Sequence, residues 1–170
     1  MQFLIIPNIP IPNVKVDFYE DDHREEVYDI LPRKYKKTKW PSKTNLPCYN
    51  CTIVTNRIPL FVPAIIQPNG IIFRCDHQSV CSVPCALSWI YENAKDDAEK
   101  RRYIANLRYL VREMTGYDLE NYTPAMSRST LKKFGGKFSD HQYQREIILL
   151  SGRLIQKLYT NPADYYYDLS

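Results

Sequence analysis

Four cysteines in two closely spaced pairs place the strongest constraint on how this chain can fold. Cys48 and Cys51 have two residues between them, and Cys81 and Cys85 have three. A two-residue spacing suits a tight turn that directs both sulfurs to one point, and a four-residue step along a helix puts both side chains on one face. The intervening residues 52–80 suffice for a β-hairpin that brings the pairs together. The sequence therefore predicts one structural zinc ion bound by all four cysteines.

Three other interpretations of the cysteines stay open. Cys75 and His77 lie just before the second pair and could replace it, which would give Cys48, Cys51, Cys75 and His77 as the ligands. The cysteines could also be reduced thiols in a core, since free cysteine is among the most buried residue types. Disulfide exchange at the CxxC pair is a third possibility, but it is typical of a βαβ setting, which this region lacks.

The chain around the cysteines divides into three predicted parts. Residues 1–29 combine an extended, proline-rich arm with a short acidic helix, expected near 21–31. Residues 30–94 hold the zinc module and a preceding basic loop, and residues 95–170 form a helical region packed on it. The predicted fold class is α+β, a small treble-clef-like zinc-binding β-hairpin module followed by a helical C-terminal half.

Turn residues and apolar runs predict the hairpin. Strand-like segments cover 52–55, 60–66 and 71–74, and the turn between the last two is Pro68-Asn69-Gly70. The hairpin therefore falls between the two cysteine pairs.

Apolar side chains at helical spacing predict three helices in the second half of the chain. The first has Pro84 in its first turn, where a missing N–H is tolerated. The second follows a break near 95–97 and is stopped by Gly116. The third begins at Ser139, and Gln142 completes a capping box with it.

Positive charge is gathered in blocks on either side of the cysteines. Residues 30–75 contain no acidic residue, and a loop within them interleaves cations with Tyr35 and Trp40. Such a composition suits phosphate contacts combined with base stacking, although acidic segments elsewhere in the chain could instead pair with the cations. The candidate residues for binding nucleic acid or a partner are Arg33, Lys34, Lys36, Lys37, Lys39, Trp40, Arg101, Arg102, Arg108, Lys132 and Lys133.

Two segments resemble a known family. Residues 80–85, Val-Cys-Ser-Val-Pro-Cys, are similar to the F-C-S-x-x-C element of FCS-type (MYM/TRASH-like) zinc fingers, with Val in place of Phe. Residues 30–36 resemble the I-L-P-basic-Tyr segment that precedes C-x-x-C in the viral late gene transcription factor 2 family of poxviruses and related nucleocytoplasmic large DNA viruses. The resemblance covers residues 28–93 well and 123–145 more loosely.

The resemblance implies a non-enzymatic, zinc-stabilised adaptor that acts with viral RNA polymerase or other late transcription factors on late promoters. The expected location is the host cytoplasm, within viral factories, or the nucleus, or the virion. Contact of the basic blocks with DNA is one of two open alternatives, the other being that acidic segments of the chain pair with these cations. The alternatives are a minor structural or assembly protein bound to capsid proteins of such a virus, and a host-directed interaction module.

The sequence itself gives no sign of an enzyme or a membrane protein. It has no phosphate-binding glycine loop, no nucleophile elbow, and no set of three zinc ligands that leaves a position for water. Its strongly apolar stretches are short and contain proline, so no transmembrane or secretory segment is expected.

Overall fold

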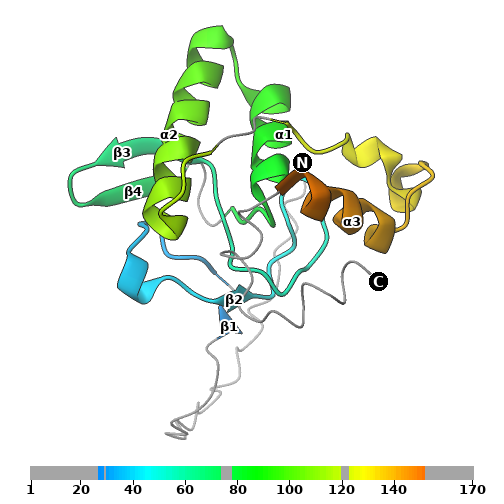
Figure 1. Ribbon diagram of the computed structural model, residues 1–170, viewed down its shortest axis with the longest axis horizontal. Helices are drawn as coiled ribbons and strands as arrows, with labels where there is room; N and C mark the ends of the chain where they lie inside the picture. Colours follow the sequence, from blue (N-terminus) through cyan, green and yellow to red (C-terminus); the bar gives the residue numbers. More distant parts are fainter. Residues whose placement is uncertain (1–26, 29, 74–77, 120–122, 152–170) are drawn as a thin grey trace, which may run out of the picture.

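Two short β-pairings and three α-helices make up the described part of the chain, so the predicted α+β class is confirmed. The structure is a computed structural model that describes residues 27–28, 30–73, 78–119 and 123–151. In Figure 1 helix α2 lies between the β3–β4 hairpin and α1, and α3 lies on the other side of α1. The elements are β1 (Val27–Tyr28), η1 (Lys37–Lys39), β2 (Lys43–Thr44), β3 (Pro63–Gln67), β4 (Gly70–Phe73), α1 (Val83–Asn93), α2 (Asp97–Thr115), η2 (Arg128–Thr130), η3 (Lys132–Phe134) and α3 (Asp140–Ser151).

The hairpin predicted between the cysteine pairs is confirmed. Strands β3 and β4 are antiparallel, and Gln67 faces Gly70 across a two-residue turn. Ile71 is buried whereas Ile65 is 54% exposed, so one face of the hairpin packs on the core and the other meets solvent. The strand predicted at 52–55 is wrong, because these residues leave the cysteine turn as irregular chain.

A second β-pairing holds the start of the described chain. Val27 pairs with Lys43 and Tyr28 with Thr44, and the two strands run parallel. The acidic helix predicted near 21–31 is therefore wrong at residues 27–28. The remainder of the predicted arm, residues 1–26, lies outside the described residues.

Helix α2 begins and ends where the sequence predicts. The Asp96 carboxylate accepts a hydrogen bond from the Glu99 amide at 2.7 Å, which caps the N-terminus. Gly116 adopts a left-handed conformation with φ 78°, and its N–H donates to the Arg112 carbonyl at 2.8 Å. Glycine adopts this conformation without steric cost, which explains the stop.

Helix α3 begins with the predicted capping box. The Gln142 amide donates to Ser139 Oγ at 3.1 Å, and the Ser139 amide donates to Gln142 Oε1 at 2.9 Å. The end of the apolar face predicted for this helix, beyond residue 151, lies outside the described residues.

Two clusters of buried side chains form the core, and α2 contributes to both. The larger joins the four cysteines to α1, α2 and α3, with Tyr103, Leu107 and Val111 as its members from α2. The smaller lies beneath the hairpin, with Leu110 as its member from α2. Each fully buried Leu or Val stabilises the fold by about 1.5–3 kcal/mol. The members of the smaller cluster are Leu31, Tyr35, Phe61, Ile71 and Leu110.

Candidate metal centre

The first cysteine pair lies in a tight turn. The Thr52 amide donates to the Cys48 carbonyl at 2.7 Å, and the Cys51 amide lies 3.5 Å from Cys48 Sγ, to which it donates. Thr52 has φ 65°, a left-handed conformation that is rare for a β-branched residue. The Tyr49 amide donates to the Ser79 carbonyl at 2.7 Å, which ties this turn to the segment before the second pair.

An isolated β-bridge brings the second pair to the first. The amides of Leu60 and Val80 each donate to the other's carbonyl, at 3.0 and 2.9 Å. Because Val80 directly precedes Cys81, this bridge fixes the position of the second pair relative to the segment that follows the first.

The second pair lies at the N-terminus of α1. Ser82 is the N-cap, and its Oγ accepts a hydrogen bond from the Cys85 amide at 3.2 Å. Cys81 precedes the cap and Cys85 lies in the first turn, so both sulfurs face the same point. The unpaired N–H groups of a helix start stabilise negative charge, which favours thiolates at this place.

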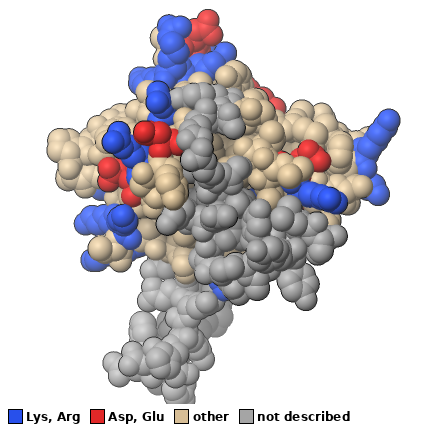
Figure 2. Space-filling view, viewed as in Figure 1, with Lys and Arg blue, Asp and Glu red and all other residues tan. Residues whose placement is uncertain are grey.

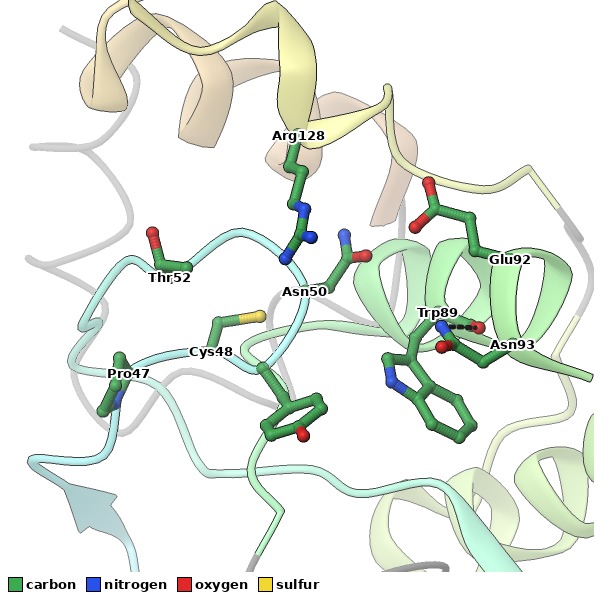
Figure 3. A pocket seen from close by; sticks show the side chains of 9 residues that line it. Pro47, Cys48, Asn50, Thr52, Trp89, Glu92, Asn93 and Arg128 are labelled. Carbon is green, nitrogen blue, oxygen red and sulfur yellow. Dashed lines mark hydrogen bonds between the residues drawn. The ribbon is translucent and has the colours of Figure 1, made fainter. Parts of the chain in front are cut away.

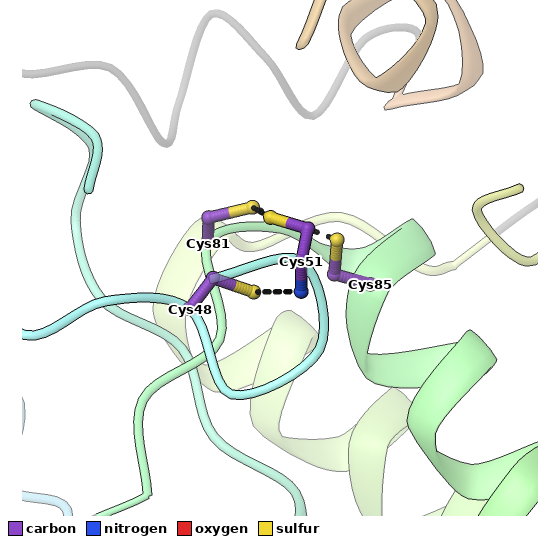
Figure 4. A group of neighbouring side chains, drawn as sticks. All are labelled: Cys48, Cys51, Cys81 and Cys85. Carbon is purple, nitrogen blue, oxygen red and sulfur yellow. Dashed lines mark hydrogen bonds between the residues drawn. The ribbon is translucent and has the colours of Figure 1, made fainter. Parts of the chain in front are cut away.

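All four sulfurs meet in a closed, buried group (Figure 4). Every Sγ lies within 4.8 Å of the others; Cys51 and Cys81 Sγ are 3.8 Å apart, and Cys81 and Cys85 Sγ are 3.6 Å apart. A tetrahedral ion with metal–sulfur bonds of about 2.3 Å requires sulfur–sulfur distances of about 3.8 Å. The four cysteines therefore fit one tetrahedrally bound metal ion, and Cys48 and Cys85 complete the set around it.

Mutual hydrogen bonding sets the acidity of these thiols. The pKa of Cys81 lies well below its usual value because of side-chain hydrogen bonding with the other cysteines, Cys48 foremost. The pKa values of Cys51 and Cys85 are raised, chiefly by hydrogen bonding with Cys48. A metal ion bound here displaces the thiol protons, so proton release accompanies metal binding.

Two buried polar side chains, Gln144 and Arg57, influence the sulfurs. Gln144 of α3 is 6% exposed, and its Nε2 lies 3.7 Å from Cys51 Sγ and 3.8 Å from Cys81 Sγ. Arg57 is 2% exposed, and its positive charge helps to lower the pKa of Cys81. A hydrogen-bond donor and a cation both suit sulfurs that carry the negative charge of metal-bound thiolates.

Neither of these two groups is among the site residues predicted from the sequence. A signal was present for Gln144, because it lies three residues before the core residue Ile147 and beside Tyr143, on the side of α3 that turns inward. Arg57 was visible only as one cation of a basic block, and nothing local marks it as buried.

The predicted basic loop has an exposed part and a packed part. Arg33, Lys34 and the Lys residues around η1 are exposed. Trp40 is half-buried, and its Nε1 donates to the Pro59 carbonyl at 2.8 Å. The Trp40 ring centre lies 5.2 Å from that of Phe61 and 5.3 Å from that of Tyr35. Packing into the smaller core cluster therefore accounts for both aromatic residues of this loop.

The other predicted cations lie on separate elements. Arg101, Arg102 and Arg108 are on exposed positions of α2, and Arg102 pairs with Glu99 at 3.4 Å. Lys132 is exposed in η3, and Lys133 pairs with Asp140 at 3.3 Å. On the face drawn in Figure 2, Lys and Arg lie in several separate groups with acidic side chains among them.

The alternative ligands Cys75 and His77 lie outside the described residues. Among the helices that are described, none has both the length and the apolar content needed to cross a bilayer.

Comparison with known proteins finds relatives in a large DNA virus. The chain is 28% identical over 142 residues to "Uncharacterized protein B175L" of African swine fever virus, in the tick isolate Pretoriuskop Pr4 and in the Badajoz strain, covering 81% of this chain and 79% of each relative. The B175L protein of the Kenyan pig isolate KEN-50 is 28% identical over 137 residues, which is 78% of this chain and 77% of the relative. No family model matches the chain. No solved structure matches it. By sequence, the chain is thus similar to viral proteins that carry no stated activity.

Proposed function

We propose that Cys48, Cys51, Cys81 and Cys85 hold one structural zinc ion. The observation that carries this proposal is the closed group of four buried sulfurs at tetrahedral spacing. Four thiolates leave no position for water or substrate, which is typical of a structural site rather than a catalytic one. Tetrahedral four-sulfur sites hold either zinc or iron, and zinc needs no redox partner.

Native mass spectrometry and elemental analysis of the purified chain test the metal. One zinc per folded chain is the expected result. Iron in place of zinc, or a folded chain without metal, would overturn this assignment.

We further propose that the chain is a non-enzymatic adaptor in late viral transcription. Three observations support this function: relatives in a large DNA virus, the C-S-x-x-C pair at the start of α1, and a basic loop ahead of the first cysteine pair. This combination resembles the viral late gene transcription factor 2 family. In this proposal the partners are the viral RNA polymerase or other late transcription factors.

The zinc ion would act as a scaffold for the binding surfaces. It would join the first cysteine turn, the segment after the hairpin and the start of α1, while Gln144 adds α3 to the same point. Exposed cations of the basic loop, such as Arg33, Lys34 and Lys36, would then be presented to acidic protein surfaces or to DNA phosphates.

Affinity purification of the tagged chain from infected cells tests this role. We expect viral RNA polymerase subunits to be retained through nuclease treatment and to be released as the salt of the washes is raised. A test variant with Lys36→Gln and Lys37→Gln leaves the four cysteines unchanged. It should retain less polymerase than the unchanged chain at equal salt. Stoichiometric presence of the chain in stripped capsids, with no polymerase bound in cells, would support the structural alternative instead.

A further inference from the structure

A pocket of about 430 Å³ lies beside the candidate metal centre, and Cys48 forms part of its wall (Figure 3). Its walls come from residues 47–50 and Thr52 of the first cysteine turn, from the last turns of α1 and from Arg128 of η2. Pockets that hold small ligands have volumes of about 300–1,000 Å³, so this one is large enough to receive a few side-chain groups.

One wall of the pocket carries a buried donor without a partner. Asn50 is 3% exposed, and within the described part of the chain its Nδ2 makes no hydrogen bond. A buried, unsatisfied amide costs free energy, which a ligand regains when it brings an acceptor. Asn50 is held in place by the cysteine turn, because it lies between Tyr49, whose amide is bonded to Ser79, and the ligand Cys51.

A second donor faces the same space. The Arg128 guanidinium lies 5.7 Å from the ring centre of Phe134, and no carboxylate of the described residues pairs with it. Figure 3 shows the guanidinium reaching from η2 toward the Asn50 amide. A neutral donor and a cation that point at one place suit a carboxylate, which can accept from both at once.

The remaining walls distinguish between classes of anion. Glu92 of α1 lines the same pocket, and its negative charge would repel the many phosphates of a nucleic acid more strongly than the single carboxylate of a peptide side chain. The same carboxylate can accept N–H groups of a peptide backbone. Trp89 and the 56%-exposed Tyr49 add aromatic surface for an apolar neighbour.

We propose that this pocket binds a short peptide segment of a partner protein through an Asp or Glu side chain, with its carboxylate between Asn50 and Arg128. The site goes beyond the proposed metal centre and does not depend on the partner being part of the transcription machinery. The pocket would thus be a binding site for acidic side chains at the edge of the cysteine turn.

Titration of the 15N-labelled, metal-loaded full chain tests the site by NMR. The probes are N-acetyl-glutamate methylamide, its glutamine counterpart and dimethyl phosphate. We expect the glutamate probe to give saturable shifts at the Asn50 side-chain amide and the Trp89 indole N–H, with millimolar affinity. The glutamine and phosphate probes should shift these signals far less.

Arg128→Met provides the matched variant, because Arg128 is exposed and its replacement leaves the core intact. Loss of the charged hydrogen bond should weaken glutamate binding about tenfold or more. Arg145→Met, an exposed substitution on α3 outside the pocket, should leave it unchanged. Equal shifts with the glutamine probe, stronger shifts with dimethyl phosphate, or unchanged binding in Arg128→Met would each overturn the proposal.

Discussion

The side-chain nitrogen of Gln144 lies 3.7 Å from the sulfur of Cys51, although 93 positions separate the two residues. This contact joins α3 directly to the candidate metal centre. Hydrogen bonds from surrounding groups fix the orientation of metal ligands and moderate the charge on their sulfurs. Helix α3 is therefore part of the surroundings of the candidate metal centre.

Gln144→Leu removes this donor while keeping a side chain of similar size. Loss of such outer contacts typically lowers metal affinity by about 10- to 100-fold, so we expect faster zinc transfer to a coloured chelator. The matched control is Gln67→Leu, which makes the same change at an exposed end of β3. Equal transfer rates in both variants would show that Gln144 does not support the metal.

Cys85→Ser removes one of the four sulfurs from the first turn of α1. The remaining three cannot close the tetrahedron, and apparent binding free energies of structural zinc are about 10–16 kcal/mol in small zinc domains. We expect the variant to bind no zinc and to lose its cooperative thermal transition in circular dichroism. Treating the unchanged chain with a chelator should reproduce this loss, and a chelator-treated chain that melts normally would contradict it.

Tyr35 should make stability fall at alkaline pH. Burial raises its pKa above the ordinary value of 10.0, with a smaller contribution from the negative charge of Glu113. The folded chain thus holds the phenol proton more tightly than the unfolded chain does. The stabilisation is complete below about pH 10 and is lost as pH rises through the raised pKa. Urea unfolding from pH 9 to 11 measures how steeply the free energy of unfolding falls with pH. The fall should be less steep in Tyr35→Phe.

Gly136→Ala should destabilise the segment between η3 and α3. A Cβ at this position would lie 2.1 Å from the Thr130 carbonyl carbon and oxygen, so the backbone must move. Overpacking of this kind costs about 1–3 kcal/mol. Gly116→Ala is the control, because a Cβ at this position has no atom within 4 Å. This variant is destabilised only by the left-handed backbone conformation, with φ 78°. Urea denaturation measures the free energy of unfolding of both variants. A smaller decrease in Gly136→Ala than in Gly116→Ala would contradict the steric explanation.

Features that depend on neighbouring residues were predictable from the sequence. The cysteine spacing, the Pro68-Asn69 turn and the capping box of Ser139 with Gln142 are all local, and the structure contains each of them. These signals were sufficient for the fold class, for the hairpin and for the meeting of both cysteine pairs.

Features that depend on distant contacts were not predictable in this way. Gln144 reaches the sulfurs only because α3 packs on α1 with one particular face. The basic neighbours of Trp40 favour base stacking, whereas in the structure its indole N–H donates to the Pro59 carbonyl and its ring packs on Phe61 and Tyr35. The strand expected at 52–55 failed because the cysteine turn directs the chain away, with Thr52 in a left-handed conformation.

Helix α2 contributes Leu107 to one buried cluster and Leu110 to the other. The chain has two tryptophans, and each cluster has one: Trp89 lies in the cluster that contains the cysteines, and Trp40 packs against the cluster beneath the hairpin. The molecule thus carries an intrinsic fluorophore in each half of its interior. With one tryptophan replaced at a time, emission from the other reports whether the two halves melt together or in sequence.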